Sequence, residues 1–114
     1  MATVYPLRAL RPRADIADKV ASVPYDVVNC EEARQLAKGN PLSFLHVTKP
    51  EIDLDNAIDA YDAAVYAQGA KALATMVAEG VLSQDDAPCF YAYALTMNGH
   101  TQTGIVLGAS VDEY

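Results

Sequence analysis

The clearest hydrophobic pattern lies in the second half of the chain, where apolar or small residues recur every three or four positions. They are Ile58, Tyr61, Val65, Gly69, Ala72 and Met76. This spacing places them on one face of an amphipathic helix, which we expect to run from Asp59 or Asp62 to Glu79. Gly80 is expected to end the helix, and Val81-Leu82 to fold back onto it as an apolar contact.

Alternating positions near the C-terminus predict a β-hairpin, with one strand from Pro88 to Met97 and the other from His100 to Val111. The two strands are joined by Asn98-Gly99. A two-residue turn needs positive φ angles at both positions, and asparagine followed by glycine tolerates them well. With this turn, Met97 lies opposite His100, and the remaining pairs follow at fixed register.

The two faces of this hairpin differ in character. The first is largely apolar and is expected to pack on the long helix; it holds Phe90, Ala92, Ala94, Ile105, Leu107 and Ala109. The second face carries Tyr91, Tyr93 and Gln102. It is expected to meet solvent or a partner, and it is our candidate interaction face.

Shorter elements are expected in the rest of the chain. In order they are a strand over Thr3 to Leu10 bent at Pro6, a helix over Asp15 to Ala21, an extended segment over Val23 to Val27, a helix begun by Asn29 and closed by Gly39, a strand over Ser43 to Thr48 and an acidic loop over Glu51 to Asp59. The extended segment is expected because the residue before a proline avoids the α region.

The resulting order of elements is β-α-α-β-α-β-β. It predicts an α+β fold, with a small, mainly antiparallel sheet whose C-terminal hairpin packs on one long helix and two short helices. The length of 114 residues is that of one domain, and 52% hydrophobic with 20% charged residues is typical of a soluble globular protein. We therefore expect a single α+β unit over residues 1–114.

The charge of the chain narrows the choice of partners. The net charge is −7, and residues 51–114 hold ten acids against the single base Lys71. Such a chain repels phosphate backbones and anionic membranes, so we expect neither nucleic acid nor a membrane as a partner. No segment has the pattern of a signal peptide or of a membrane span, and the expected location is the cytoplasm.

No combination of residues predicts a catalytic group, a metal site or a cofactor held by this chain. A glycine-rich phosphate loop and a nucleophile elbow are both absent from the sequence, and the cysteines and histidines lack metal-ligand spacing. On the expected strand, Ser43 and His46 point to opposite faces, so they cannot act as nucleophile and base. His46 is expected to be half-buried and bonded to a backbone group. Glu51, Asp53 and Asp55 are expected to be solvated, with general acid–base catalysis as the alternative.

Two short segments are candidates for binding a small-molecule ligand. Arg8 and Arg11 lie in the basic N-terminal segment, where they could hold a small anion or could simply pair with acids elsewhere in the chain. The segment Pro24-Tyr25-Asp26 would present Tyr25 and Asp26 on a rigid, ligand-facing edge. The alternative is a structural turn with Tyr25 packed in the core.

Several segments resemble the bacterial family called domain of unknown function 1015. They run in order along the chain as Pro6–Pro12, Val23–Val27, Asn40–Val47, Pro50–Asp53, Gln102–Gly104 and Ser110–Tyr114. The resemblance implies that this chain is the N-terminal part of a much longer protein. In family members a later Asp-Gly-His-His-Arg motif is similar to one in ParB-like free-serine kinases, where it helps to bind phosphate.

The resemblance also implies an activity. It suggests a nucleotide-dependent enzyme acting on a small amino acid such as serine, with ATP or ADP and Mg²⁺ as possible requirements of the full-length protein. The residues in this chain would then lack the catalytic motifs, and its main partner would be the missing carboxy-terminal part. The alternative is a non-catalytic domain that binds a ligand or another protein.

Overall fold

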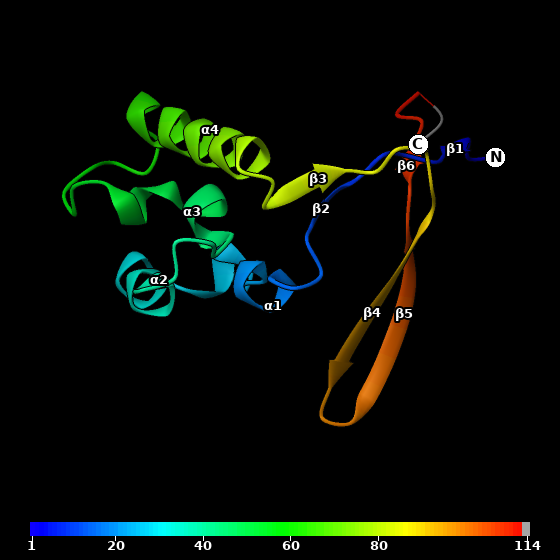
Figure 1. Ribbon diagram of the computed structural model, residues 1–114, viewed down its shortest axis with the longest axis horizontal. Helices are drawn as coiled ribbons and strands as arrows, with labels where there is room; N and C mark the ends of the chain where they lie inside the picture. Colours follow the sequence, from blue (N-terminus) through cyan, green and yellow to red (C-terminus); the bar gives the residue numbers. More distant parts are fainter. Residues whose placement is uncertain (113–114) are drawn as a thin grey trace. The chain divides into compact units, whose positions relative to one another are not determined.

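The computed structural model describes residues 1–112 and confirms an α+β fold built from helices and small antiparallel sheets (Figure 1). The chain divides into two compact units. Unit 1 consists of Met1–Arg11 and Gln84–Tyr114, and unit 2 of Pro12–Ser83. Two short strands, β2 (Leu10–Pro12) and β3 (Leu82–Gln84), carry the chain from one unit to the other. The prediction of a single folding unit stays a prediction.

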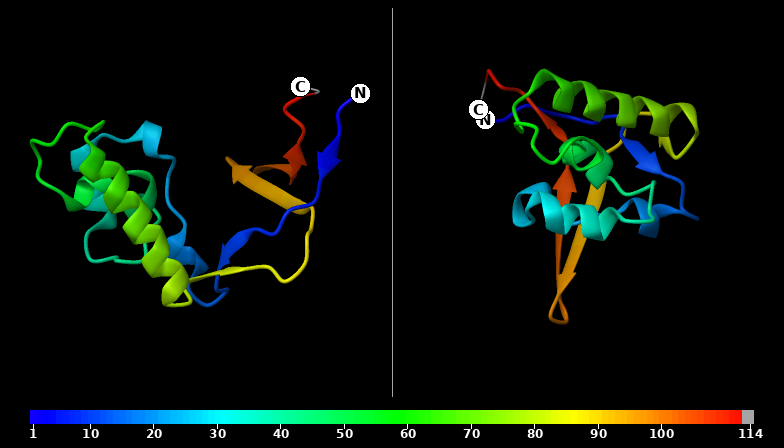
Figure 2. Two further views of the ribbon diagram at one scale, coloured as in Figure 1. Left: turned by 90° about the horizontal axis from the view of Figure 1, so that it is seen from above. Right: turned by 90° about the vertical axis from the view of Figure 1, so that its left-hand side faces the viewer.

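Unit 2 is helical. Its elements are α1 (Ala17–Val20), η1 (Tyr25–Val27), α2 (Cys30–Ala37), α3 (Leu45–Thr48), η2 (Pro50–Asp53) and α4 (Ala63–Ala78), where η marks a 3₁₀ helix. Within this unit α4 contacts both α3 and η2, and it lies alongside the shorter helices in Figure 2. Apolar burial is concentrated in two clusters, one around Val20 and Met76 and the other around Ala33 and Leu45.

The long helix confirms most of its prediction. The side chain of Asp62 accepts a hydrogen bond from the Ala64 amide at 2.8 Å and so caps α4, while Gly80 takes a φ of +73° just after its end. Val65, Gly69 and Met76 form its buried stripe. Val81 folds back as predicted, and its amide donates to the Met76 carbonyl at 2.9 Å. The helix begins only at Ala63, so the two most N-terminal residues of the predicted stripe precede it.

Helix α2 also follows its predicted capping chemistry. The Asn29 side chain accepts from the Glu32 amide at 2.8 Å, and the Glu32 carboxylate accepts from the Asn29 amide at 3.1 Å. This reciprocal pair satisfies two amides that a helix start leaves free. Lys38 and Gly39 end the helix, with Gly39 at a φ of +74°.

The predicted strand over Ser43 to Thr48 is wrong, because this segment contains helix α3. Leu45 packs in the cluster with Ala33, whereas Phe44 and Val47 pack against the cluster that holds Met76. A short helix buried on two sides places apolar residues at neighbouring positions, and over six residues this pattern resembles the alternation of a strand.

Two further expectations are corrected in this unit. Residues 25–27 form η1 rather than extended chain, since Pro24 restricts the residue before it and itself suits the start of a helical turn. The first part of the predicted acidic loop is the 3₁₀ helix η2, which begins at Pro50 and buries Ile52.

Unit 1 contains the predicted hairpin, formed by β4 (Tyr91–Met97) and β5 (His100–Val106). Its register is confirmed, with Met97 opposite His100 and Tyr91 opposite Val106. The turn has φ of +52° at Asn98 and +77° at Gly99, as its sequence requires.

The N-terminal strand is shorter than predicted. β1 covers Val4–Tyr5 and pairs with β6 (Gly108–Ala109), after which Leu7 forms an isolated bridge with Cys89. Pro6 interrupts the ladder because it has no amide hydrogen. The last residue of the predicted strand, Leu10, is the first residue of a separate strand, β2 (Leu10–Pro12). The C-terminal family segment lies partly outside the described residues, at positions 113 and 114.

The prediction that one face of the hairpin packs on the long helix stays a prediction, because β4 and β5 belong to unit 1 and α4 belongs to unit 2. Ile105 on the apolar face is 71% exposed, and Tyr93 on the other face is 58% exposed. Within residues 1–112 no third strand pairs with β4 or β5, so both edges of the hairpin are unpaired. Among the helices of residues 1–112, none is long and apolar enough to cross a membrane.

Candidate functional site

The two arginines predicted to bind a ligand both contact Asp85, within unit 1. Arg11 Nε lies 3.0 Å from Asp85 Oδ2, and its Nη2 lies 3.1 Å from Oδ1, so the pair is bidentate. The Arg11 guanidinium carbon also lies 5.6 Å from the centre of the Tyr91 ring. Arg11 is thus paired with a carboxylate through Nε and Nη2.

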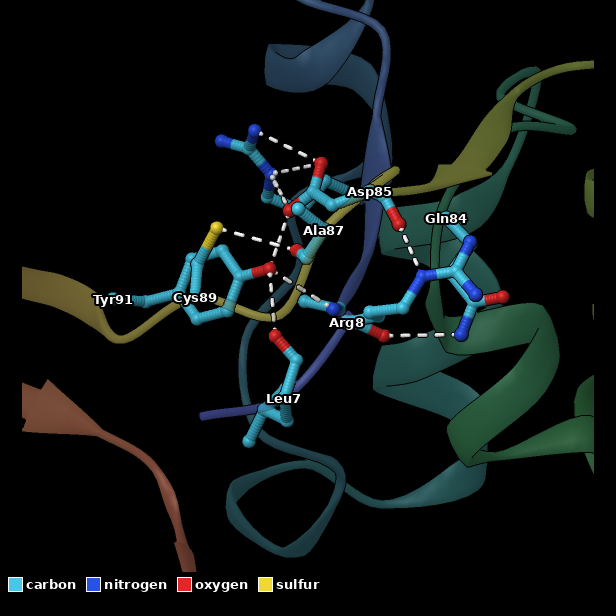
Figure 3. A network of polar contacts seen from close by, with 9 residues as sticks. Leu7, Arg8, Gln84, Asp85, Ala87, Cys89 and Tyr91 are labelled. Atoms are coloured by element: carbon cyan, nitrogen blue, oxygen red, sulfur yellow. Dashed lines mark hydrogen bonds and ion pairs between the residues drawn. The ribbon is translucent and has the colours of Figure 1, made fainter. Parts of the chain in front are cut away.

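Tyr91 completes this cluster, as Figure 3 shows for the labelled residues Tyr91, Asp85 and Leu7. Its hydroxyl donates to the Asp85 carboxylate and accepts from the Ala9 amide at 3.0 Å. The Leu7 carbonyl lies 3.3 Å from the same hydroxyl. Tyr91 therefore holds the N-terminal segment in place through its hydroxyl, and the interaction face predicted for it stays a prediction.

The charges of the cluster follow from these contacts. Hydrogen bonds from Tyr91 and then from Arg11 lower the pKa of Asp85 below its ordinary value. The hydrogen bond to Asp85 raises the pKa of Tyr91, because losing the phenolic proton would place two anions side by side. The same carboxylate raises the pKa of Arg11. At neutral pH these shifts favour a carboxylate at Asp85, an uncharged phenol at Tyr91 and a cation at Arg11.

Arg8 differs from Arg11 in that its donors are largely available. Its Nε donates to the backbone oxygen of Asp85 at 2.7 Å, and its own carbonyl accepts from Gln84 Nε2 at 3.2 Å. Among residues 1–112 the two terminal amino groups of its guanidinium make no hydrogen bond. The guanidinium is therefore oriented through one nitrogen and offers the other two to an anion.

The other two predicted ligand-binding residues lie in η1 of unit 2. Tyr25 lines a pocket of about 670 Å³ between α4 and the segment of α3 and η2, whereas the exposed Asp26 is not part of the lining. We call this the tyrosine pocket. Its residues are Tyr25, Val47, Thr48, Lys49, Pro50, Glu51, Ala60, Tyr61, Val65, Tyr66, Gly69, Ala70 and Leu73.

The pocket has aromatic side chains at its rim and small or apolar residues at its floor. Tyr25, Tyr61 and Tyr66 are 57%, 83% and 62% exposed, which is unusual for large side chains gathered around one depression. Gly69 makes the floor possible: a Cβ there would lie 3.2 Å from both Pro50 Cγ and the Val47 carbonyl oxygen. The helix α4 therefore approaches η2 closely at this point.

One wall of the pocket carries a nearly buried pair of opposite charges. The side chains of Lys49 and Glu51 are 13% and 12% exposed, with Lys49 Nζ 3.9 Å from Glu51 Oε1. Lys49 Nζ also donates to the Tyr25 carbonyl at 3.2 Å, and Cys30 Sγ lies 3.8 Å from the Glu51 carboxylate. The expectation that Glu51 is a solvated loop acid is wrong, because η2 turns it inward.

His46 forms a second polar cluster in unit 2. Its Nδ1 lies 2.6 Å from Asp53 Oδ2, and its Nε2 lies 3.0 Å from the Asn40 carbonyl. The predicted half-buried histidine with a backbone partner is confirmed, but on a helix and with a carboxylate as a second partner. Both partners only accept, so both contacts are hydrogen bonds when both ring nitrogens carry a proton. Asp53 is thus paired rather than merely solvated.

The remaining predicted residues stay predictions. Tyr93 stands opposite Gly104 and Gln102 opposite Leu95, all exposed on the hairpin. Sequence reasoning missed Lys49, Tyr61 and Tyr66. Their signal was weak: Tyr61 and Tyr66 flank the start of α4, and only the fold brings them to the same depression as Tyr25.

Comparison with known proteins gives one family. The model of a family described as protein of unknown function, DUF1015, matches residues 4–114. No curated protein and no solved structure matches the chain.

Proposed function

The chain belongs to the DUF1015 family of proteins of unknown function, and we propose that it is the ligand-binding part of a cytoplasmic kinase that acts on a small amino acid. Serine is the first candidate. Its hydroxyl would attack a phosphoryl group of ATP or ADP, giving phosphoserine and the shortened nucleotide. The reaction class is supported by the resemblance of a later family motif to that of ParB-like free-serine kinases.

The tyrosine pocket is the observation that carries this proposal. Small-molecule sites are concave, largely apolar and about 300–1,000 Å³ in volume, with a few polar groups that orient the ligand. A pocket of about 670 Å³ with three tyrosines and one Lys–Glu pair fits this description. Tyr25 lines it and was singled out by the sequence for the same role. Asp26, exposed beside Tyr25, stays a candidate ligand contact in this proposal.

Arg8, in unit 1, is a separate candidate contact for an anionic group. A guanidinium with two free amino groups is well suited to a phosphate or carboxylate oxygen, because its planar fork can bond two oxygens at once. The substrate classes proposed here, a nucleotide and an amino acid, both carry such groups. Arg11 would support Arg8 by fixing Asp85, whose backbone oxygen orients the Arg8 side chain.

The proposal assigns no Mg²⁺ ligand to this part of the chain. Kinase sites usually hold the ion through one or two carboxylates, several waters and the phosphates of the substrate. Residues 1–112 contain no group of three or more His, Cys, Asp or Glu side chains that could hold a metal ion. The proposal therefore gives these residues binding and orientation only, and it assigns phosphoryl transfer to the carboxy-terminal part.

The test uses the natural gene product that contains this sequence. With L-serine, Mg²⁺ and either ATP or ADP, it should form phosphoserine, which ³¹P NMR detects directly. Tyr25→Ala should raise the KM of one substrate by about tenfold, as expected for one lost stacking contact. Tyr5→Ala is the control, because Tyr5 is a similarly exposed tyrosine in β1.

Two results would contradict the proposal. Absence of phosphoserine with both nucleotides would remove the kinase activity. Equal KM values for the natural protein and Tyr25→Ala would remove the tyrosine pocket from substrate binding.

A non-catalytic interaction domain is the second candidate, and the exposed hairpin favours it. A two-stranded sheet with no other layer is marginally stable in water, so a covering partner would stabilise it. We propose that this partner is the carboxy-terminal part of the same polypeptide. Hydrogen exchange of the β4 and β5 amides should then be much slower in the natural gene product than in residues 1–114, and equal rates would contradict it.

A further inference from the structure

We infer that the tyrosine pocket binds the flat heteroaromatic ring of a nucleobase, held by tyrosine stacking and by the Lys49–Glu51 pair. The link to a nucleotide substrate rests on the proposed function. The choice of a planar ring with a polar edge rests on the geometry of unit 2 alone.

The aromatic rim supports a planar ligand. Tyr25, Tyr61 and Tyr66 come from three different segments: η1, the turn before α4 and α4 itself. Tyrosine rings bury large areas and have few rotatable bonds, so they can stack on a flat ring at low entropic cost. Their exposed rings are therefore available to a ligand that enters the pocket.

The apolar lining of the pocket suits the face of a ring. Gly69 and Pro50 are in close contact, since a Cβ on Gly69 would lie 3.2 Å from Pro50 Cγ. Val65 beside them is buried, and Ala70 and Leu73 continue the apolar lining. Ligand pockets of this kind are lined mainly by apolar side chains, with a few polar groups that orient the ligand.

The Lys49–Glu51 wall supports a ring that carries an acceptor next to a donor. The ammonium group has three donor hydrogens, of which the Tyr25 carbonyl uses one. The distance of 3.9 Å to Glu51 Oε1 is too long for a hydrogen bond, so Lys49 and Glu51, which both line the pocket, keep a donor and an acceptor for a ligand. Nucleobases have this complementary pair on their pairing edge, as adenine does with N1 and its amino group.

The charge of this wall supports a neutral ring. Lys49 and Glu51 have opposite charges and lie close together, so their fields largely cancel at the pocket. A ligand with a net charge at this position would be desolvated without a compensating partner. A neutral heterocycle with polar edges loses little hydration free energy when it enters the pocket. Any phosphate group that it carries would point away from this wall.

The decisive experiment titrates adenosine, which has no phosphate, into the ¹⁵N-labelled chain and follows the amide shifts by NMR. Saturable shifts should appear at Tyr25, Gly69 and the residues near Lys49. Tyr66→Ala should weaken the affinity for adenosine about tenfold. Tyr5→Ala should leave it unchanged, because Tyr5 lies in unit 1, outside the pocket.

A second variant tests the polar wall. Glu51→Gln keeps the size and an acceptor of Glu51 but removes its charge, so it should reduce adenosine affinity less than Glu51→Ala does. Ribose and inorganic pyrophosphate are the further probes, and both should leave the pocket amides unshifted.

The outcomes separate this inference from the kinase proposal. Absence of saturable shifts with adenosine, shifts confined to unit 1, identical affinity in Tyr66→Ala, or the same shifts with pyrophosphate would each overturn the inference. Adenosine binding at the pocket without phosphoserine formation would support the inference and overturn the kinase. Phosphoserine formation without adenosine binding at the pocket would do the reverse.

Discussion

The Tyr91 hydroxyl donates its hydrogen to the carboxylate of Asp85, six residues earlier in the chain. The same hydroxyl accepts from the Ala9 amide, and Ala9 in turn accepts from the Asp85 amide at 3.0 Å. Together with the Leu7–Cys89 bridge, these contacts attach the N-terminal segment to the rest of unit 1. In unit 1 polar contacts join segments that are distant in the sequence, whereas in unit 2 apolar burial joins them.

Removing the Tyr91 hydroxyl should therefore loosen unit 1. Tyr91→Phe leaves the Ala9 amide without its acceptor and Asp85 without one donor, so the N-terminal segment should exchange its amide hydrogens faster. Tyr93→Phe is the matched control, because the Tyr93 hydroxyl makes no hydrogen bond within residues 1–112. Native-state hydrogen exchange of the Leu7 and Ala9 amides measures the effect, and equal rates in the two variants would show that the cluster does not hold the segment.

The same cluster predicts how stability depends on pH. The pKa of Asp85 lies below its ordinary value of 3.8, so its contribution is present above that value and is lost as the pH falls through the lowered pKa. The pKa of Tyr91 lies above its ordinary value of 10.0, so its contribution is present below that value and is lost as the pH rises through the raised pKa.

We expect the stability of unit 1 to be level across neutral pH and to decline at both ends. Urea unfolding followed through the unit 1 amides from strongly acidic to strongly alkaline pH measures this. Asp85→Asn removes the titrating carboxylate and the main cause of the Tyr91 shift, so it should reduce both declines. If the pH profile of Asp85→Asn matched that of the natural sequence, the groups whose titration lowers the stability of unit 1 would lie outside this cluster.

The corrected helix α3 gives a prediction for unit 2. Leu45 is 2% exposed and packs against Ala33, Ala37 and Ile52. Leu45→Ala should lower the free energy of unfolding by about 2–5 kcal/mol, through lost burial and the cavity left behind. Leu36→Ala, at a position 56% exposed on α2, should cost well under 1 kcal/mol by the same measurement. Urea unfolding monitored by circular dichroism compares them, and equal costs would contradict the packing of α3.

Elements whose ends are fixed by local chemistry could be predicted from the sequence. Asn29 begins α2, Asp62 is one of the two predicted starts of α4, and Asn98-Gly99 sets the register of the hairpin. In each case the deciding interaction lies within three residues. These interactions could therefore be predicted without knowing how the rest of the chain packs or whether a partner binds.

The rest depends on contacts between distant positions. Whether residues 43–48 form a strand or a helix depends on two apolar clusters from other segments, so six residues could not decide it. The tyrosine pocket likewise needs Tyr25 and Tyr66 to meet, 41 positions apart in a chain whose periodicity marks neither of them. Tyr25 and Asp26 in unit 2, and Arg8 and Arg11 in unit 1, could be proposed in advance because proline and clustered charge are visible locally.

The hairpin turn offers a test that separates backbone strain from packing. Gly99 and Gly104 both have open space where a Cβ would be placed, but only Gly99 has a positive φ, of +77°. Gly99→Ala should therefore destabilise the hairpin by about 1–2 kcal/mol, the cost of the left-handed conformation for a residue with a Cβ. Gly104→Ala adds the same methyl group to extended chain and should leave the hairpin as stable or slightly more so. Hydrogen exchange of the Met97 and His100 amides reports the opening of the turn, and equal protection in both variants would mean that the turn does not set the hairpin.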